Sequence, residues 1–196
     1  MFIQTEATPN PATLKFIPGK AVLGSGTVDF RSADEAIRSP LAYRLFGIEG
    51  VSGVFLGPDF ISVTKGDAEW QHIKPAVLGV IMEHYLSGAP VVSDGAVAAE
   101  ASEEDFAAED QEIVDTIKEL LETRVRPAVA QDGGDIVFHG FRDGIVYLHM
   151  RGACSGCARG CCGVGVSSER VVSGDRVNVS RDCEFGRRSG VCATRR

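Results

Sequence analysis

The residues best suited to chemistry in this 196-residue chain are its six cysteines, all of which follow residue 150. They are Cys154, Cys157, Cys161, Cys162, Cys183 and Cys192. Thiolates are soft anionic ligands that suit iron–sulfur clusters, zinc and copper(I). Because no export signal is recognisable in the sequence, this clustering favours metal or redox chemistry in a reducing compartment over a disulfide framework.

Cys154 and Cys157 form a C-x-x-C pair, flanked by glycines that let the backbone wrap closely around a metal centre. The pair supplies two ligands, whereas a [4Fe–4S] cluster or a tetrahedral zinc ion takes four. Either two chains share one cluster, or Cys161 and Cys162 complete a site within one chain. A shared cluster is easily released, because separating the subunits removes half of its ligands, and that property suits a carrier.

Two other functions remain open at this point. A zinc-binding structural module would use all four cysteines between residues 154 and 162. A dithiol oxidoreductase would use the pair alone, although the Trp-flanked helix start of a thioredoxin site is absent. We expect His139 and His149 to lie on strand faces rather than to bind metal. We expect Asp132 and Asp135 to form a turn.

Composition limits the remaining functions. Hydrophobic residues make up 44% and charged residues 24%, as in an ordinary folded protein. The net charge of −7 comes from acidic residues before residue 158, which would repel phosphate, so we expect no nucleic-acid partner. No apolar run reaches the ~20 residues of a membrane span. The first ten residues lack the features of a leader, which predicts a cytoplasmic location.

Composition also divides the chain into four segments, 1–88, 89–108, 109–157 and 158–196. The first and third predict an α+β fold of two small α/β domains. The second is rich in Pro, Ser, Gly, Ala and acidic residues, which predicts a flexible acidic linker. The last is an atypical tail rich in Arg, Gly and Cys, with a hint of a strand only at 170–180.

Local patterns predict the elements of segment 1–88. Alternating β-rich runs predict strands at 2–4, 13–17, 27–30, 51–56 and 60–65. Ser39-Pro40 is typical of a helix start, with serine as the cap. Apolar residues recur every four positions from Ile73 to Tyr85, which predicts a helix over 70–86 in which Pro75 causes a kink or a late start.

In segment 109–157, the pattern predicts one helix over about 109–130, with Pro127 bending or ending it. The sequence Asp-Gly-Gly-Asp at 132–135 predicts a tight turn. Strands at 136–141 and 145–150 then form a hairpin. The cysteine pair comes directly after the second strand.

At these positions the chain resembles the NifU-like iron–sulfur scaffold family. The C-terminal resemblance rests on Arg126-Pro127, Gln131-Asp132-Gly133-Gly134-Asp135-Ile136, Gly144-Ile145-Val146-Tyr147-Leu148 and Gly152-Ala153-Cys154-Ser155-Gly156-Cys157. The N-terminal (Nfu-type) resemblance rests on Thr5-Glu6-Ala7-Thr8-Pro9-Asn10-Pro11, Leu14-Lys15-Phe16, Ser39-Pro40-Leu41-Ala42, Leu45-Phe46, Gly50-Val51 and Asp59-Phe60-Ile61.

The resemblance implies a non-enzymatic scaffold or carrier that delivers a [4Fe–4S] cluster to apo-proteins. Cys154 and Cys157 would be the ligands, one pair from each subunit of a homodimer. Apo iron–sulfur clients and the cluster-assembly machinery would be its partners. The N-terminal domain is similar to one without known catalytic residues, so none is assigned to it.

The resemblance ends after Cys157. The family continues with Pro and a Ser/Thr-rich start of an amphipathic helix, whereas here the chain continues Ala158-Arg159-Gly160-Cys161-Cys162. Residues 158–196 have the composition of a shifted reading frame in GC-rich DNA. We therefore expect an incomplete second domain whose hairpin has a half-uncovered apolar face, at a cost of several kcal/mol at ~25 cal/mol per Å².

The hypothesis that residues 158–196 come from a shifted reading frame makes a prediction about the coding DNA. Beyond the codon for Cys157, one of the two other frames should encode a Pro-Ser-type continuation followed by an amphipathic helix. Translating the gene in all three frames is the measurement, and two frames without such a helix would rule out the frameshift.

Overall fold

The computed structural model describes residues 2–93, 111–142, 145–155, 183–185 and 191–194. The strands are β1 (Gln4–Ala7), β2 (Thr13–Ile17), β3 (Val28–Phe30), β4 (Val51–Leu56), β5 (Ile61–Lys65), β6 (Gly134–Arg142), β7 (Ile145–Gly152), β8 (Cys183–Phe185) and β9 (Val191–Thr194). The helical segments are η1 (Glu35–Arg38), α1 (Pro40–Phe46), α2 (Trp70–Ser87), α3 (Gln111–Leu120), the π-helical η3 (Leu121–Val125) and α4 (Arg126–Gln131).

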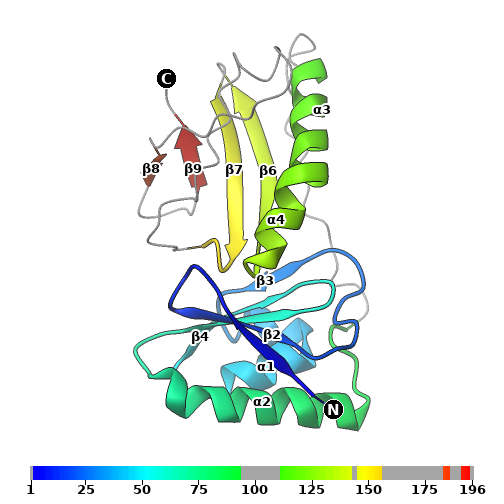
Figure 1. The fold of residues 1–196 in the computed structure, drawn as a ribbon, viewed down its shortest axis with the longest axis vertical. Coiled ribbons are helices and arrows are strands. Elements are labelled where there is room, and N and C mark those ends of the chain that lie inside the picture. Colours follow the sequence, from blue (N-terminus) through cyan, green and yellow to red (C-terminus); the bar gives the residue numbers. More distant parts are fainter. Residues whose placement is uncertain (1, 94–110, 143–144, 156–182, 186–190, 195–196) are drawn as a thin grey trace.

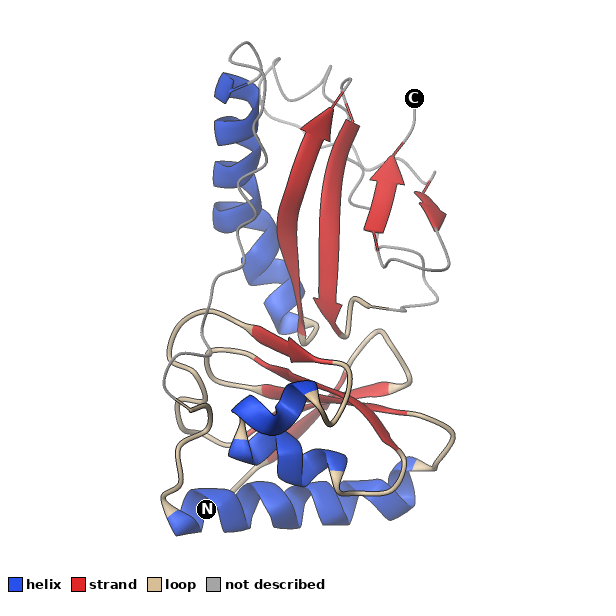
Figure 2. Cartoon of the chain, turned by 180° about the vertical axis from the view of Figure 1, so that it is seen from behind, coloured by secondary structure: helices blue, strands red, loops and turns tan. Residues whose placement is uncertain are grey.

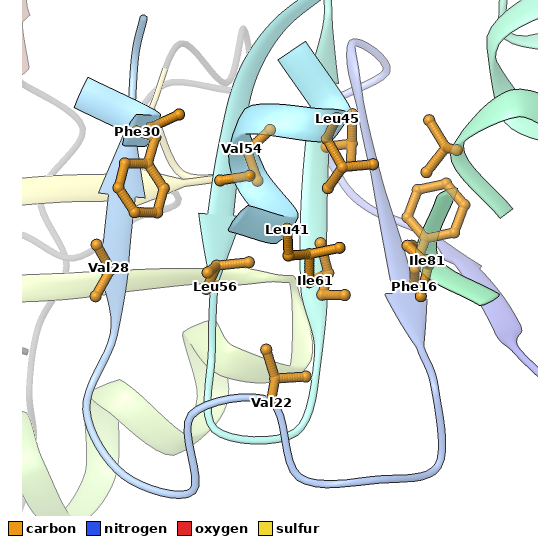
Figure 3. Packing of buried hydrophobic residues seen from close by; sticks show 14 of the residues in the cluster. Phe16, Val22, Val28, Phe30, Leu41, Leu45, Val54, Leu56, Ile61 and Ile81 are labelled. Atoms are coloured by element: carbon orange, nitrogen blue, oxygen red, sulfur yellow. The ribbon is translucent and has the colours of Figure 1, made fainter. Parts of the chain in front are cut away.

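The N-terminal domain is an antiparallel sheet in the order β1-β2-β5-β4-β3, with α1 and α2 on one face (Figures 1 and 2). The α+β prediction is confirmed. Between the sheet and these helices lies a core that includes Phe16, Phe30, Leu41, Leu45, Leu56, Ile61 and Ile81 (Figure 3). The strand predicted at 2–4 forms later, at Gln4–Ala7, where it pairs with β2.

The second face of this sheet is buried as well. In β2 and β5, Phe16 and Ile61 point to the helices, and the alternate residues Lys15 and Ser62 point away from them. Lys15 and Ser62 are nevertheless buried. A polar strand face loses contact with water only when something covers it, and here the second unit of the chain does so (Figure 1).

The helix starts follow the sequence signals closely. Ser39 Oγ accepts a hydrogen bond from Ala42 N at 3.1 Å, and Pro40 is the first residue of α1, as predicted. Helix α2 begins at Trp70 and continues through Pro75, so the late start is not observed. The apolar stripe of α2 explains its continuity, because Ile73, Val77 and Ile81 are all buried in the core.

The second unit is the β6–β7 hairpin with α3, η3 and α4 along one face (Figure 1). Buried residues of both layers form its core: Val114, Ile117, Leu121, Ile136, Phe141, Val146, Leu148 and Met150. Among the described residues, the apolar face of the hairpin is therefore covered, and the expectation of a half-uncovered face is wrong. The helical segments that precede the hairpin cover it, through Val114, Ile117 and Leu121.

Pro127 neither ends the helix nor leaves it regular. A π-helical turn, Leu121–Val125, directly precedes α4, and Pro127 lies in the first turn of α4. Because proline has no N–H, it cannot donate to the carbonyl four residues earlier, and a π-turn absorbs such a break. Where the sequence predicted a bend, the helix therefore changes from α-helical to π-helical before α4 begins.

Two strands of the tail extend the second sheet, in the order β6-β7-β9-β8. β9 pairs antiparallel with β7, with Leu148 opposite Cys192. The predicted strand at 170–180 and most of the predicted linker lie outside the described residues. In the part that the structure describes, no helix is long and apolar enough to cross a membrane.

His84 of α2 generates a stability prediction. It is 1% exposed, and neither ring nitrogen has a hydrogen-bond partner among the described residues. Burial, with a smaller contribution from the charge of Arg44, lowers the pKa of His84 from 6.5. The unfolded chain therefore takes up this proton first as the pH falls, so this contribution to stability is complete above about pH 6.5 and decreases below it.

Replacing His84 should remove that pH dependence. We expect His84→Leu to lose less stability than the unchanged chain between pH 7.5 and pH 5.5 (approximate working values around the histidine pKa). Urea unfolding followed by Trp70 fluorescence measures it. The control is His72→Gln, an exposed histidine of the same helix. Equal pH dependence in His84→Leu and His72→Gln would contradict the prediction.

Candidate functional site

Cys154 follows directly on the β6–β7 hairpin, at the end of the hairpin nearest to the N-terminal domain (Figure 1). The register pairs Gly134 with Gly152, so the first residue of β6 lies opposite the last residue of β7. The backbone then turns: Ala153 N donates to Gly133 O at 3.1 Å, and Ser155 N donates to Gly152 O at 3.0 Å. Cys154 is thus placed by backbone hydrogen bonds to two glycines.

Gly133 and Gly152 have positive φ angles, +77° and +61°, which side chains other than glycine rarely adopt. A side chain at either position would also have no space. A Cβ on Gly152 would lie 2.8 Å from both Gly133 O and Phe55 Cγ, and one on Gly133 would lie 2.7 Å from Ser62 Oγ. Phe55 and Ser62 belong to the N-terminal sheet, so these glycines also allow the two domains to approach.

Gly134 makes room for the sulfur itself. A Cβ at this position would lie 2.5 Å from Cys154 Sγ and 2.9 Å from Cys154 N. The thiol is therefore turned toward Gly134, and Cys154 is half-buried against the core of the second unit. Of the Asp-Gly-Gly-Asp segment predicted as a tight turn, only Asp132 and Gly133 form a turn, whereas Gly134 and Asp135 begin β6. The two glycines also shape the cysteine site.

Asp135 lies in β6 rather than in the predicted turn, and its carboxylate is the acceptor of an ion pair. It is 3% exposed and accepts two hydrogen bonds from Arg126, from Nε at 2.9 Å and from Nη2 at 3.0 Å. Hydrogen bonding to Asp135 raises the pKa of Arg126. Thr27 Oγ1 of the N-terminal domain donates to the same carboxylate at 2.6 Å. This bidentate ion pair fixes the first residue of α4 to the start of β6. The pair lies next to residues 152–155, which we call the cysteine turn.

One face of the N-terminal domain contacts the cysteine turn, and we call Asn10, Lys15, Phe55 and Ser62 together the docking face. Asn10 Nδ2 donates to Ala153 O and to Ser155 O, each at 3.3 Å. Ser62 Oγ donates to Gly133 O at 2.7 Å. These bonds reach the backbone on both sides of Cys154 and the turn that precedes β6.

Lys15 of the docking face binds the end of α4. Its ammonium donates to Ala130 O at 3.2 Å and to Gln131 O at 3.0 Å. The last carbonyls of a helix lack intrahelical partners and carry a partial negative charge, so a cation stabilises them. Lys15 also lies over the Phe60 ring, 4.9 Å from its centroid, and 3.5 Å from Glu6.

The two histidines of the hairpin lie away from Cys154 in the register. His139 lies where the β6–β7 register shifts, at a bulge. His149 Nε2 lies 3.3 Å from Arg31 Nη2 of the N-terminal domain. Burial, then the charges of Arg31 and Arg151, lower the pKa of His149, so it serves the contact between domains as a neutral ring.

Among the described residues, no three His, Cys, Asp or Glu side chains come together as a metal site. Cys157, Cys161 and Cys162 lie outside these residues, so the assignment of Cys157 and the four-cysteine zinc site stay predictions. The position of Cys154 after the second strand was predicted from the sequence. Asn10, Lys15 and Ser62 were not, because only the packing of the two domains brings them to it. The Arg126–Asp135 ion pair was not predicted either.

Neutralising Asp135 should weaken the second unit. We expect Asp135→Asn to lower the local stability of β6 and β7 by about 1.5–3 kcal/mol, the range for hydrogen bonds to charged groups. Native-state hydrogen exchange of the β6 and β7 amides measures it. The matched control is Glu122→Gln, because Glu122 is 69% exposed and also pairs with Arg126. Similar exchange in the two variants would contradict the role of Asp135.

Sequence comparisons identify proteins that are similar to most of this chain. The chain is 53% identical over 159 residues to the human "NFU1 iron-sulfur cluster scaffold homolog, mitochondrial", which covers 80% of this chain and 61% of that protein. It is 50% identical over 160 residues to "NifU-like protein 4, mitochondrial" of Arabidopsis thaliana, covering 80% and 56%. A solved NifU-like protein from Saccharomyces cerevisiae has a TM-score of 0.44 and 28% identity, covering 48% of this chain and 86% of that one.

The prediction of a cytoplasmic location is wrong in the light of these relatives, whose names place them in mitochondria. That prediction rested on the lack of a leader in the first ten residues. The chain spans only about 55–61% of the length of these curated relatives, so such a lack carries no weight.

Two family descriptions match successive parts of the chain. Residues 3–88 match "Scaffold protein Nfu/NifU N terminal", and residues 117–162 match "NifU-like domain". The first description and the name of the human relative are those of scaffold proteins, in agreement with the expectation that the chain is not an enzyme. With both domains in this order, the chain belongs to the Nfu/NifU family of scaffold proteins.

Proposed function

We propose that this chain binds a [4Fe–4S] cluster through Cys154 and Cys157 and delivers it to apo-proteins. The observation that carries the proposal is the place of Cys154, on a glycine-lined turn at the end of a rigid hairpin. The relatives named as iron–sulfur cluster scaffolds support the same function. The cluster is cargo rather than a resident cofactor.

The donor set fits this cargo. Thiolates are the usual ligands of [4Fe–4S] clusters, and a C-x-x-C pair supplies two of the four needed. Two chains, each giving Cys154 and Cys157, complete the set in a homodimer. Such a cluster is held at the boundary of two subunits and leaves when the client's thiolates replace those of this chain one at a time.

The hairpin and the turn after it place Cys154. Gly134 lacks the Cβ that would displace the sulfur, and Gly152 allows the chain to reverse directly after β7. The Arg126–Asp135 ion pair holds the start of β6, opposite the end of β7. These features fix the backbone on both sides of Cys154 at the end of the hairpin.

Anaerobic reconstitution with iron and sulfide tests the proposal. We expect a brown protein with visible absorption, and loss of most of that absorption in Cys154→Ala and Cys157→Ala. The matched control is Cys192→Ala, a cysteine on β9 that is not assigned to the cluster. Iron and sulfide per chain, measured chemically, should equal half of a [4Fe–4S] cluster.

Other results would overturn the proposal in defined ways. Colourless protein with one zinc per monomer, lost in Cys161→Ala, would instead indicate the zinc module. A reversible metal-free disulfide with turnover would indicate a dithiol oxidoreductase. A chain that stays iron-free even when residues 158–196 are replaced by the family's helix would exclude cluster binding altogether.

A further inference from the structure

The docking face binds the backbone on both sides of the proposed cluster ligand Cys154. Asn10 is the centre of this contact: it is 5% exposed, and its amide nitrogen reaches the carbonyls of Ala153 and Ser155. Its amide oxygen accepts a hydrogen bond from Ala12 N at 3.0 Å, which fixes the orientation of the side chain. The amide group of Asn10 is therefore fixed in orientation and binds the residues on both sides of Cys154.

With this contact made, the sulfur of Cys154 is turned into its own domain. Sγ lies so close to Gly134 that a Cβ there would be 2.5 Å away, and Cys154 packs against the core of the second unit. A ligand shared between two chains must direct its sulfur toward the partner. The docked arrangement thus differs from the one that cluster binding across a dimer requires.

We propose that the docking face covers the cysteine turn of the same chain. The cysteine turn must separate from Asn10 and Ser62 before Cys154 can bind iron or contact a second chain. This inference rests on the proposed role of Cys154 in cluster binding. The N-terminal domain then regulates the site in cis. In the absence of cargo it keeps the thiol turned inward.

The contacts fit a cover that opens reversibly. The bonds from Asn10 and Ser62 to the second unit are between neutral groups, and such bonds contribute little net free energy each. The other contacts are polar or charged: Lys15 with the last carbonyls of α4, Thr27 with Asp135, and Arg31 with His149. Polar contacts between domains of one chain resemble transient interfaces, which favour relative domain motion.

The alkylation rate of Cys154 in the metal-free full chain tests the inference. Iodoacetamide labelling is followed by mass spectrometry of the tryptic peptide 152–159, with fragmentation assigning the label to Cys154. The main variant is Asn10→Asp. It keeps the acceptor for Ala12 N and replaces the donor by an oxygen that repels the carbonyls of Ala153 and Ser155. We expect labelling to accelerate at least about fivefold, the factor that one neutral hydrogen bond supplies.

The matched control is Gln71→Glu, the same change from amide to carboxylate at an exposed position of α2, beyond the opposite face of the sheet. A second variant, Ser62→Ala, removes the donor to Gly133 O without adding charge, and we expect it to accelerate labelling as well. Ser62→Ala decides the matter if Asn10→Asp does not fold, as judged by circular dichroism. Rates within about twofold of the control, well below the effect of one hydrogen bond, would overturn the inference.

The labelling experiment needs no iron, so it separates this inference from the proposed function. If the unchanged chain binds no cluster while Asn10→Asp accelerates labelling, the cover exists and the proposed cargo is wrong. If the cluster binds and labelling is unchanged in both variants, the proposed function stands and the cover is wrong.

Discussion

The close approach of two glycine turns to the N-terminal sheet is the constraint on which the rest of the structure depends. Gly133 and Gly152 both have positive φ angles, and a Cβ on either would lie within 2.8 Å of Ser62 or Phe55. Because no side chain intervenes, backbone carbonyls of the second unit come within hydrogen-bond distance of the sheet. The position of Cys154 follows from this contact, since its turn is bonded to the same glycines.

The same contact buries polar groups of the N-terminal sheet and supplies their hydrogen-bond partners. Lys15 and Ser62 are on the sheet face that points away from the hydrophobic core, yet both are buried. Buried polar groups require partners, and theirs are the carbonyls of α4 and of the glycine turn. Each domain thus completes the hydrogen bonding of the other, and the cysteine turn lies where they meet.

Local patterns predicted the elements, because periodicity, caps and turn residues act over a few positions. Ser39-Pro40 predicted the start of α1 and the repeat from Ile73 predicted α2, whereas β6 begins at Gly134, before the start of the strand predicted at 136–141. Asn10 was missed because its partners at 153 and 155 are distant in sequence, and an Asn between two prolines signals only a loop. The expectation of a half-uncovered hairpin face was wrong, because the sequences of the two strands do not show which helix packs on them.

The contact between the domains is most directly measured by nuclear magnetic resonance of the metal-free chain labelled at glycine and phenylalanine. The close approach of Gly152 to Phe55 predicts a nuclear Overhauser effect between the Gly152 Hα protons and the Phe55 ring, with the Hα resonance shifted by the ring current. A Gly152 resonance at an unshifted position, without any cross-peak to Phe55, would contradict the arrangement that positions Cys154.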